Sequence, residues 1–167
     1  LGCMLYHAGN AVEAAALWER AAQAAPEAYQ PYRNLAVARY SHLGRRDEAL
    51  PLLSKALSLR PHDAQLVWEK ALVMARLRAE PKKIVAFLEK EICDREDVVL
   101  ELCQAYNMAG RYPKTLRLMD ATRFTPCEGG EHAVAEQYMF AHHALGRGLL
   151  GRGKPQAALR HFRAAQE

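Results

Sequence analysis

One spacing recurs along this chain and restricts what the chain can fold into. A glycine is followed five residues later by a small residue, nine residues later by a large apolar one, and twelve residues later by another small one. The four sets are Gly9, Ala14, Trp18 and Ala21; Gly44, Ala49, Leu53 and Ala56; Gly110, Thr115, Met119 and Thr122; and Gly153, Ala158, Phe162 and Ala165. A pattern that returns at a fixed period indicates a repeat architecture, in which each repeat is one supersecondary unit.

The residues before each glycine repeat as well. Three pairs place their second residue seven before the glycine, namely Leu1-Gly2, Leu102-Cys103 and Leu145-Gly146, and Leu35-Ala36 places it eight before. Ala49 and Thr115 are 66 residues apart, which two periods of about 33 would fill. We therefore expect a degenerate repeat between them, with Ile84 as the anchor of its second helix.

These spacings predict two helices in every repeat. The glycine would end the first helix in a left-handed conformation, and the small residues would let the helices approach to about 8–10 Å. Pro26 and Pro61 would stop the second helix. The expected fold is all-α, a right-handed α-solenoid of nine or ten helices, in a single array over 1–167 with about five repeats at 1–28, 29–63, 64–95, 96–127 and 131–167. Trp18 and Phe162 hold equivalent places, and we expect both to be buried between helices.

This pattern resembles the tetratricopeptide repeat (TPR) family over nearly the whole chain. It departs from the family at Cys103 and Ala36, which replace the helix-contact glycine, and at Thr115, which replaces alanine. An insertion of about nine residues precedes the last repeat. Its Glu128, Gly129, Gly130 and Glu131 resemble a loop in uncharacterised bacterial TPR proteins, which are often fused to a carbohydrate-related β-sandwich domain. The residues themselves favour a shaped connector, because paired glycines permit a tight turn.

Catalytic and cofactor chemistry is not expected. Cys127 with Glu128 and His132 lacks a third oriented group for thiol catalysis and falls short of the ligands that zinc requires. His142 and His143 are adjacent, so on a helix they point about 100° apart. Gly146 to Gly151 matches G-x-G-x-x-G, but no strand precedes it, so a dinucleotide site is not predicted. The chain is therefore not expected to be an enzyme or to bind a metal or a cofactor.

Charge and hydropathy restrict the partners. The net charge is +4 with both signs interspersed, which does not call for nucleic acid. The basic residues near the C-terminal end have no aromatic interleaving for base stacking and are interpreted as a solvated face. No apolar run is long enough to cross a bilayer, so no membrane contact is expected.

The TPR resemblance implies that the first helices of successive repeats line a concave groove. Carrying the register over, we expect the groove to hold polar side chains able to hydrogen-bond a docked segment. They are Gln30, Arg33, Asn34 and Tyr40, then Glu69, Lys70 and Arg76, then Glu101, Gln104 and Asn107, and finally His143 and Arg147. The alternative is that these are ordinary solvated helix residues. A clamp for a C-terminal carboxylate is not predicted, because Glu101 and Gln104 do not fit it.

The function expected from these residues is a scaffold that binds a protein or peptide. Two alternatives stay open: an accessory domain of a larger carbohydrate-related enzyme, and a self-association module that forms homo-oligomers through the solenoid ends. The chain begins at Leu1 inside a repeat, so we expect a domain cut from a longer protein. A cytoplasmic location is expected, because the four cysteines show no C-x-x-C and no spacing typical of zinc, which favours an intracellular chain with reduced thiols.

Overall fold

The computed structural model describes residues 1–91, 94–125 and 131–166, and over these ranges it contains ten α-helices, one short 3-10 helix and no strand. The all-helical prediction is therefore confirmed. The chain divides into two compact units, Leu1–Ala79 and Glu80–Glu167, which are described separately. The division lies inside the third predicted repeat.

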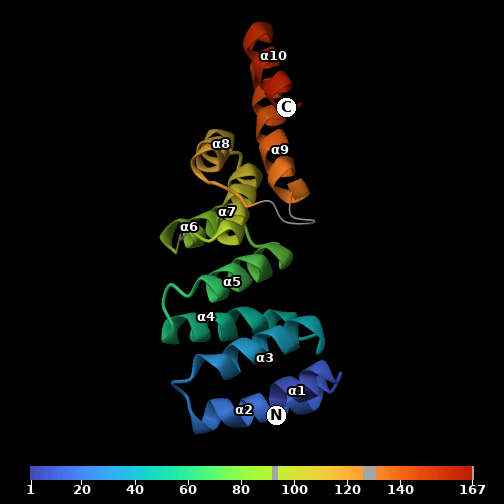
Figure 1. Ribbon diagram of the computed structural model, residues 1–167, viewed down its shortest axis with the longest axis vertical. Coiled ribbons are helices and arrows are strands. Elements are labelled where there is room, and N and C mark those ends of the chain that lie inside the picture. Colours follow the sequence, from blue (N-terminus) through green and yellow to red (C-terminus); the bar gives the residue numbers. More distant parts are fainter. Residues whose placement is uncertain (92–93, 126–130, 167) are drawn as a thin grey trace. The chain divides into compact units, whose positions relative to one another are not determined.

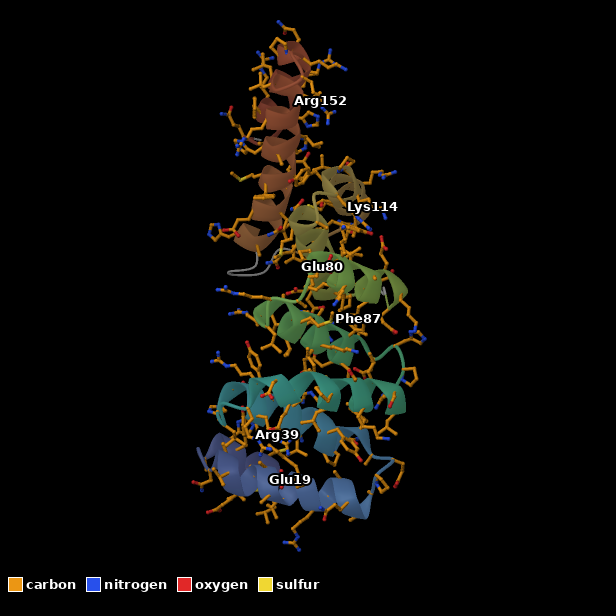
Figure 2. All side chains as sticks on the ribbon, turned by 180° about the vertical axis from the view of Figure 1, so that it is seen from behind. Glu19, Arg39, Glu80, Phe87, Lys114 and Arg152 are labelled. Carbon is orange, nitrogen blue, oxygen red and sulfur yellow. The ribbon has the colours of Figure 1, made fainter. Side chains whose placement is uncertain are left out.

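The first unit contains five α-helices, each of which packs on the next along the chain (Figure 1). They are α1 (Gly2–His7), α2 (Ala11–Ala24), α3 (Tyr29–Ser41), α4 (Ala49–Leu59) and α5 (Ala64–Arg76), with the 3-10 helix η1 (Arg46–Glu48) before α4. Charged side chains join the layers at their edge: Arg39 of α3 donates to Glu19 of α2 at 2.7 Å and also pairs with Glu48 (Figure 2).

The second unit contains five more helices. They are α6 (Pro81–Lys90), α7 (Glu96–Met108), α8 (Tyr112–Ala121), α9 (Glu131–Leu150) and α10 (Pro155–Ala164). Successive helices pack on one another, and α7 also packs on α9, so α8 and α9 both lie against α7. Figure 1 shows α9 and α10 side by side as a hairpin. The 20 residues of α9 exceed the 13 of α7, so part of the expected insertion lengthens this helix.

The predicted turn glycines lie where the spacing placed them. Gly9, Gly44, Gly110 and Gly153 follow first helices and have φ values of 88°, 68°, 73° and 70°. This left-handed region suits glycine because it has no Cβ. The third repeat uses Arg78 at φ 57° for the same turn. The backbone hydrogen bonds of this turn match those of a glycine turn. The Ala79 N–H donates to the Met74 carbonyl, and in the turn at Gly110 the Arg111 N–H donates to the Tyr106 carbonyl.

Small and large residues meet across three of the helix pairs as the pattern predicts. A Cβ added to Gly2 would lie 2.6 Å from Trp18 Nε1, and one added to Gly146 would lie 2.5 Å from Phe162 Cε1. Each pair is separated by sixteen residues, as are Cys103 and Met119, which share one hydrophobic cluster. Only glycine allows the approach that the aromatic rings make here.

The two equivalent aromatic residues, Trp18 and Phe162, differ in how deeply they are buried. Trp18 is 8% exposed, so its predicted burial is confirmed. Phe162 is only half-buried, so the prediction that it is buried between helices is wrong for it. The reason is that α10 packs chiefly against α9, which covers one side of the ring. The predicted anchor of the degenerate repeat, Ile84, is 2% exposed at the fourth position of α6, where α2 carries Ala14.

None of the described helices combines the length and the apolar character that crossing a bilayer requires.

Candidate binding groove

The second unit contains a groove between α7 and α9 with a volume of about 490 Å³. Its walls come from one face of each helix, because α7 and α9 pack directly on each other. The lining residues are Gln104, Asn107 and Met108 from α7 and Glu136, Gln137, Met139, Phe140 and His143 from α9. Three residues predicted for the groove from the sequence, Gln104, Asn107 and His143, are therefore brought together.

Apolar side chains that the sequence analysis did not name form much of the wall. Met108 is 56% exposed, Phe140 55% and Met139 44%. The ring of Tyr112, at the start of α8, lies 6.2 Å from the Phe140 ring. A signal was present, because Phe140 precedes His143 by three residues and so shares its helix face. Large apolar groups left exposed together on one surface are typical of interaction sites.

Asn107 forms the floor of the groove and is not free to bind a partner. It is 4% exposed, and its Nδ2 donates to the carbonyl oxygen of Gln137 at 2.9 Å and to Gln137 Oε1 at 3.0 Å. Its Oδ1 accepts from Thr115 Oγ1 at 2.8 Å. The amide thus joins α7, α8 and α9, which corrects the expectation that it would be a groove donor. This network also explains the threonine at a place where the first, second and fifth repeats have alanine.

His143 and Arg147 lie on the same face of α9, four residues apart. His143 is exposed in the groove and its ring lies 5.8 Å from that of Phe162. Arg147 is exposed one turn further along the helix. Gln104 is exposed on the opposite wall, and Glu101 is half-buried on α7. Polar donors therefore border the apolar wall on both helices.

The adjacent His142 points away from the groove towards α10. It is 8% exposed, and its Nδ1 lies 2.9 Å from Nδ1 of His161, so one ring donates to the other. Burial lowers the pKa of His142, the neighbouring His161 lowers it further, and Asp120 opposes the change. The prediction that the two adjacent histidines point in different directions is confirmed.

In the first unit, the predicted groove residues bond with one another. Arg33 Nε donates to both carboxylate oxygens of Glu69, at 3.0 and 2.9 Å, and Gln65 Nε2 donates to the same carboxylate at 2.7 Å. The bond to Glu69 raises the pKa of Arg33. Glu69 is 8% exposed. A charge this buried needs its partner, so Arg33 serves to join α3 to α5 and is not a free donor.

The other residues predicted for this surface occupy varied environments. Asn34 Nδ2 lies 3.8 Å from Cys3 Sγ on α1. Tyr40 is half-buried, with the Arg46 guanidinium 5.6 Å from its ring centre. Gln30 is exposed on α3, and on α5 Lys70 is half-buried and Arg76 exposed.

Reactive and metal-binding groups are sparse in the described part of the chain. Across residues 1–91, 94–125 and 131–166, no group of three or more His, Cys, Asp or Glu side chains could hold a metal ion. Burial raises the pKa of the Cys103 thiol to about 12, which keeps it protonated at neutral pH. Cys127 and the predicted loop residues Glu128, Gly129 and Gly130 lie outside the described residues, and α9 begins at Glu131.

Comparison with known proteins agrees with this architecture. Residues 139–164, which include most of the α9–α10 hairpin, match the family described as tetratricopeptide repeat. The crystal structure of MamA is similar to this chain with a TM-score of 0.67 and 16% identity, covering 99% of this chain and 92% of MamA. MamA residues 41 to the end, from Desulfovibrio magneticus RS-1, give a TM-score of 0.65 and 18% identity over 99% of this chain and 89% of that one.

A further similar structure is YrrB, described as a TPR protein with an unusual peptide-binding site. Its TM-score is 0.67 and its identity 17%, covering 98% of this chain and 80% of YrrB. Together these similarities show that the chain has the fold of TPR solenoid proteins. The predicted TPR motif is confirmed by the family match at 139–164.

Proposed function

We propose that this chain is a non-enzymatic scaffold module that binds a segment of another protein in the groove between α7 and α9. The observation that carries the proposal is the exposure of Met108, Met139 and Phe140 around a groove of about 490 Å³. A volume of this size falls within the range of about 300–1,000 Å³ that is usual for binding pockets.

The composition of the groove suits a peptide. The unbranched thioethers of Met108 and Met139 adapt to irregular apolar surfaces, and the ring of Phe140 contributes a rigid apolar area. Gln104 can donate to and accept from a peptide backbone through its exposed amide. Apolar side chains of the bound segment would supply affinity, and its main chain would be held by the polar border.

The first unit supports the same choice of site. Its most polar predicted groove residues, Arg33 and Glu69, are bonded to each other. The groove of the second unit has exposed apolar atoms with nothing in the described chain covering them. The similarity of fold to YrrB, described as having a peptide-binding site, is consistent with peptide binding by this chain.

The test is a selection of random peptides on the immobilised chain, followed by affinity measurement on three proteins. Peptides selected by the wild type should bind Phe140→Ser at least about tenfold more weakly, because burial of a phenylalanine contributes about 1.5–3 kcal/mol. Val12→Ser is the matched control, since Val12 is 72% exposed on α2 of the first unit. Equal affinity for all three proteins would place binding elsewhere and refute the groove assignment.

A further inference from the structure

Charge is distributed unevenly along α9 and α10. Residues 137–166 contain no Asp or Glu, whereas they contain five Lys and Arg: Arg147, Arg152, Lys154, Arg160 and Arg163. All five are exposed. Within the described ranges, none of these cations takes part in an ion pair. This end of the second unit therefore carries positive charge that no ion pair within the described residues neutralises.

The charge differs between the two ends of the groove, because Glu136 lines one end and Arg147 lies one helical turn beyond the lining residue His143 at the other. Glu136, Phe140, His143 and Arg147 are separated by four, three and four residues, so they follow one face of α9. Glu136 and Arg147 are eleven residues apart, which corresponds to about 16 Å along a helix. Beyond Arg147, Arg152 lies in the turn at the end of α9 (Figure 2). Lys154 is the residue that directly precedes α10.

We infer that the segment bound in this groove is apolar where it meets Met108, Met139 and Phe140, and acidic at the end that reaches Arg147. The inference rests on the proposed function and specifies its ligand. A guanidinium binds carboxylates through two parallel hydrogen bonds, and the neighbouring cations add an attraction that extends over about 8–10 Å at physiological salt. Opposite ends of the groove bear opposite charges, so they also define the direction in which the segment lies.

An acidic protein segment fits this surface better than a nucleic acid does. Binding of single strands relies on exposed aromatic rings on which bases stack. Past the groove, Phe162 of this hairpin is half-buried and packed against Gly146, and the neighbouring His161 ring is half-buried as well. The apolar wall beside Arg147 also matches a peptide with apolar side chains, which nucleic acid lacks.

The experiment uses a random twelve-residue peptide library on the wild type and on Arg147→Glu/Arg152→Glu, with Arg20→Glu on α2 as the matched control. The wild type and the control should select peptides with more Asp and Glu than Lys and Arg. The best peptide should bind about tenfold more weakly when its acidic residues are replaced by lysine. Arg147→Glu/Arg152→Glu should reverse this preference. Arg147→Gln/Arg152→Gln, which removes the charges without reversing them, should abolish it, and circular dichroism should show unchanged helix content.

Three results would overturn the inference, and they separate it from the proposed function. Selected peptides that lose affinity on Phe140→Ser but show no acidic preference would leave the groove as the site and refute its ligand chemistry. A failure to select any peptide, or peptides indifferent to Phe140→Ser, would refute the proposed function as well. A single-stranded oligonucleotide that binds more tightly than the best peptide would assign the basic surface to nucleic acid.

Discussion

The close approach of Gly146 to Phe162 permits a sharp test of the repeat packing. In Gly146→Ala, the new Cβ would lie 2.5, 2.8 and 3.0 Å from three ring atoms of Phe162. Contacts below about 3 Å force either the ring or the helix to move. Gly148 is in the same helix, and an added Cβ there would have no heavy atom within 4 Å apart from its chain neighbours and the backbone of its own helix, so Gly148→Ala is the matched control.

The two substitutions are expected to change the free energy of unfolding differently. Alanine is more favourable than glycine inside a helix by about 1 kcal/mol, so Gly148→Ala should stabilise the second unit by about that amount. Gly146→Ala receives the same gain but adds an overpacking cost of about 1–3 kcal/mol. The two variants should therefore differ by about 1–3 kcal/mol, with Gly146→Ala the less stable.

Urea denaturation monitored by circular dichroism measures this difference, and hydrogen exchange of the α9 and α10 amides localises it. A double-mutant cycle with Phe162→Leu isolates the contact, because a smaller side chain should remove the cost of the added methyl group. Equal stabilisation by Gly146→Ala and Gly148→Ala would refute the packing described for this helix pair, and with it the equivalence to Gly2 and Trp18.

Two further variants test a turn and a buried pair. Arg78→Gly should stabilise the first unit by about 0.5–1 kcal/mol in urea denaturation, because arginine in the left-handed region costs more than the entropy that glycine loses; an unchanged midpoint would contradict the positive φ. The pKa of His142 is lowered from 6.5, so the folded state binds this proton more weakly than the unfolded chain does. The free energy of unfolding should therefore fall as pH drops below 6.5. This fall should be smaller in His142→Phe. The measurement compares urea-denaturation midpoints at about pH 7.5 and 5.5 for both proteins. The same pH dependence in both would show that the His142–His161 pair does not contribute.

The helix pairs could be predicted because their packing depends on local spacing. Gly9 and Gly110 end helices through backbone geometry, and Trp18 requires a small partner wherever the two helices cross. These requirements recur with the repeat, so they are visible as periodicity. The turn at Arg78 was not visible, because the conformation is kept while the residue that signals it is lost.

The side chains of the candidate site were harder to predict, because their roles depend on residues far along the chain. Arg33 was expected to be a free donor, but it donates a hydrogen bond to Glu69, which lies 36 residues later. Asn107 lines the cavity between α7 and α9, yet its bonds to Gln137 and Thr115 make it internal. Helix register indicates which face a residue lies on and does not indicate which partner reaches it.

When the number of residues between a paired small and large residue differs, the difference lies in the turn between their helices. Three pairs keep a spacing of sixteen residues, whereas Ala36 and Leu53 are seventeen apart, with the extra residue in the connection that contains η1. One residue added inside a helix would rotate every later side chain by about 100° and turn the large residue away from its small partner. Between a paired small and large residue, a change in length is therefore expected in the hairpin connection, whereas the extra length of α9 lies before Gly146 and leaves its contact with Phe162 intact.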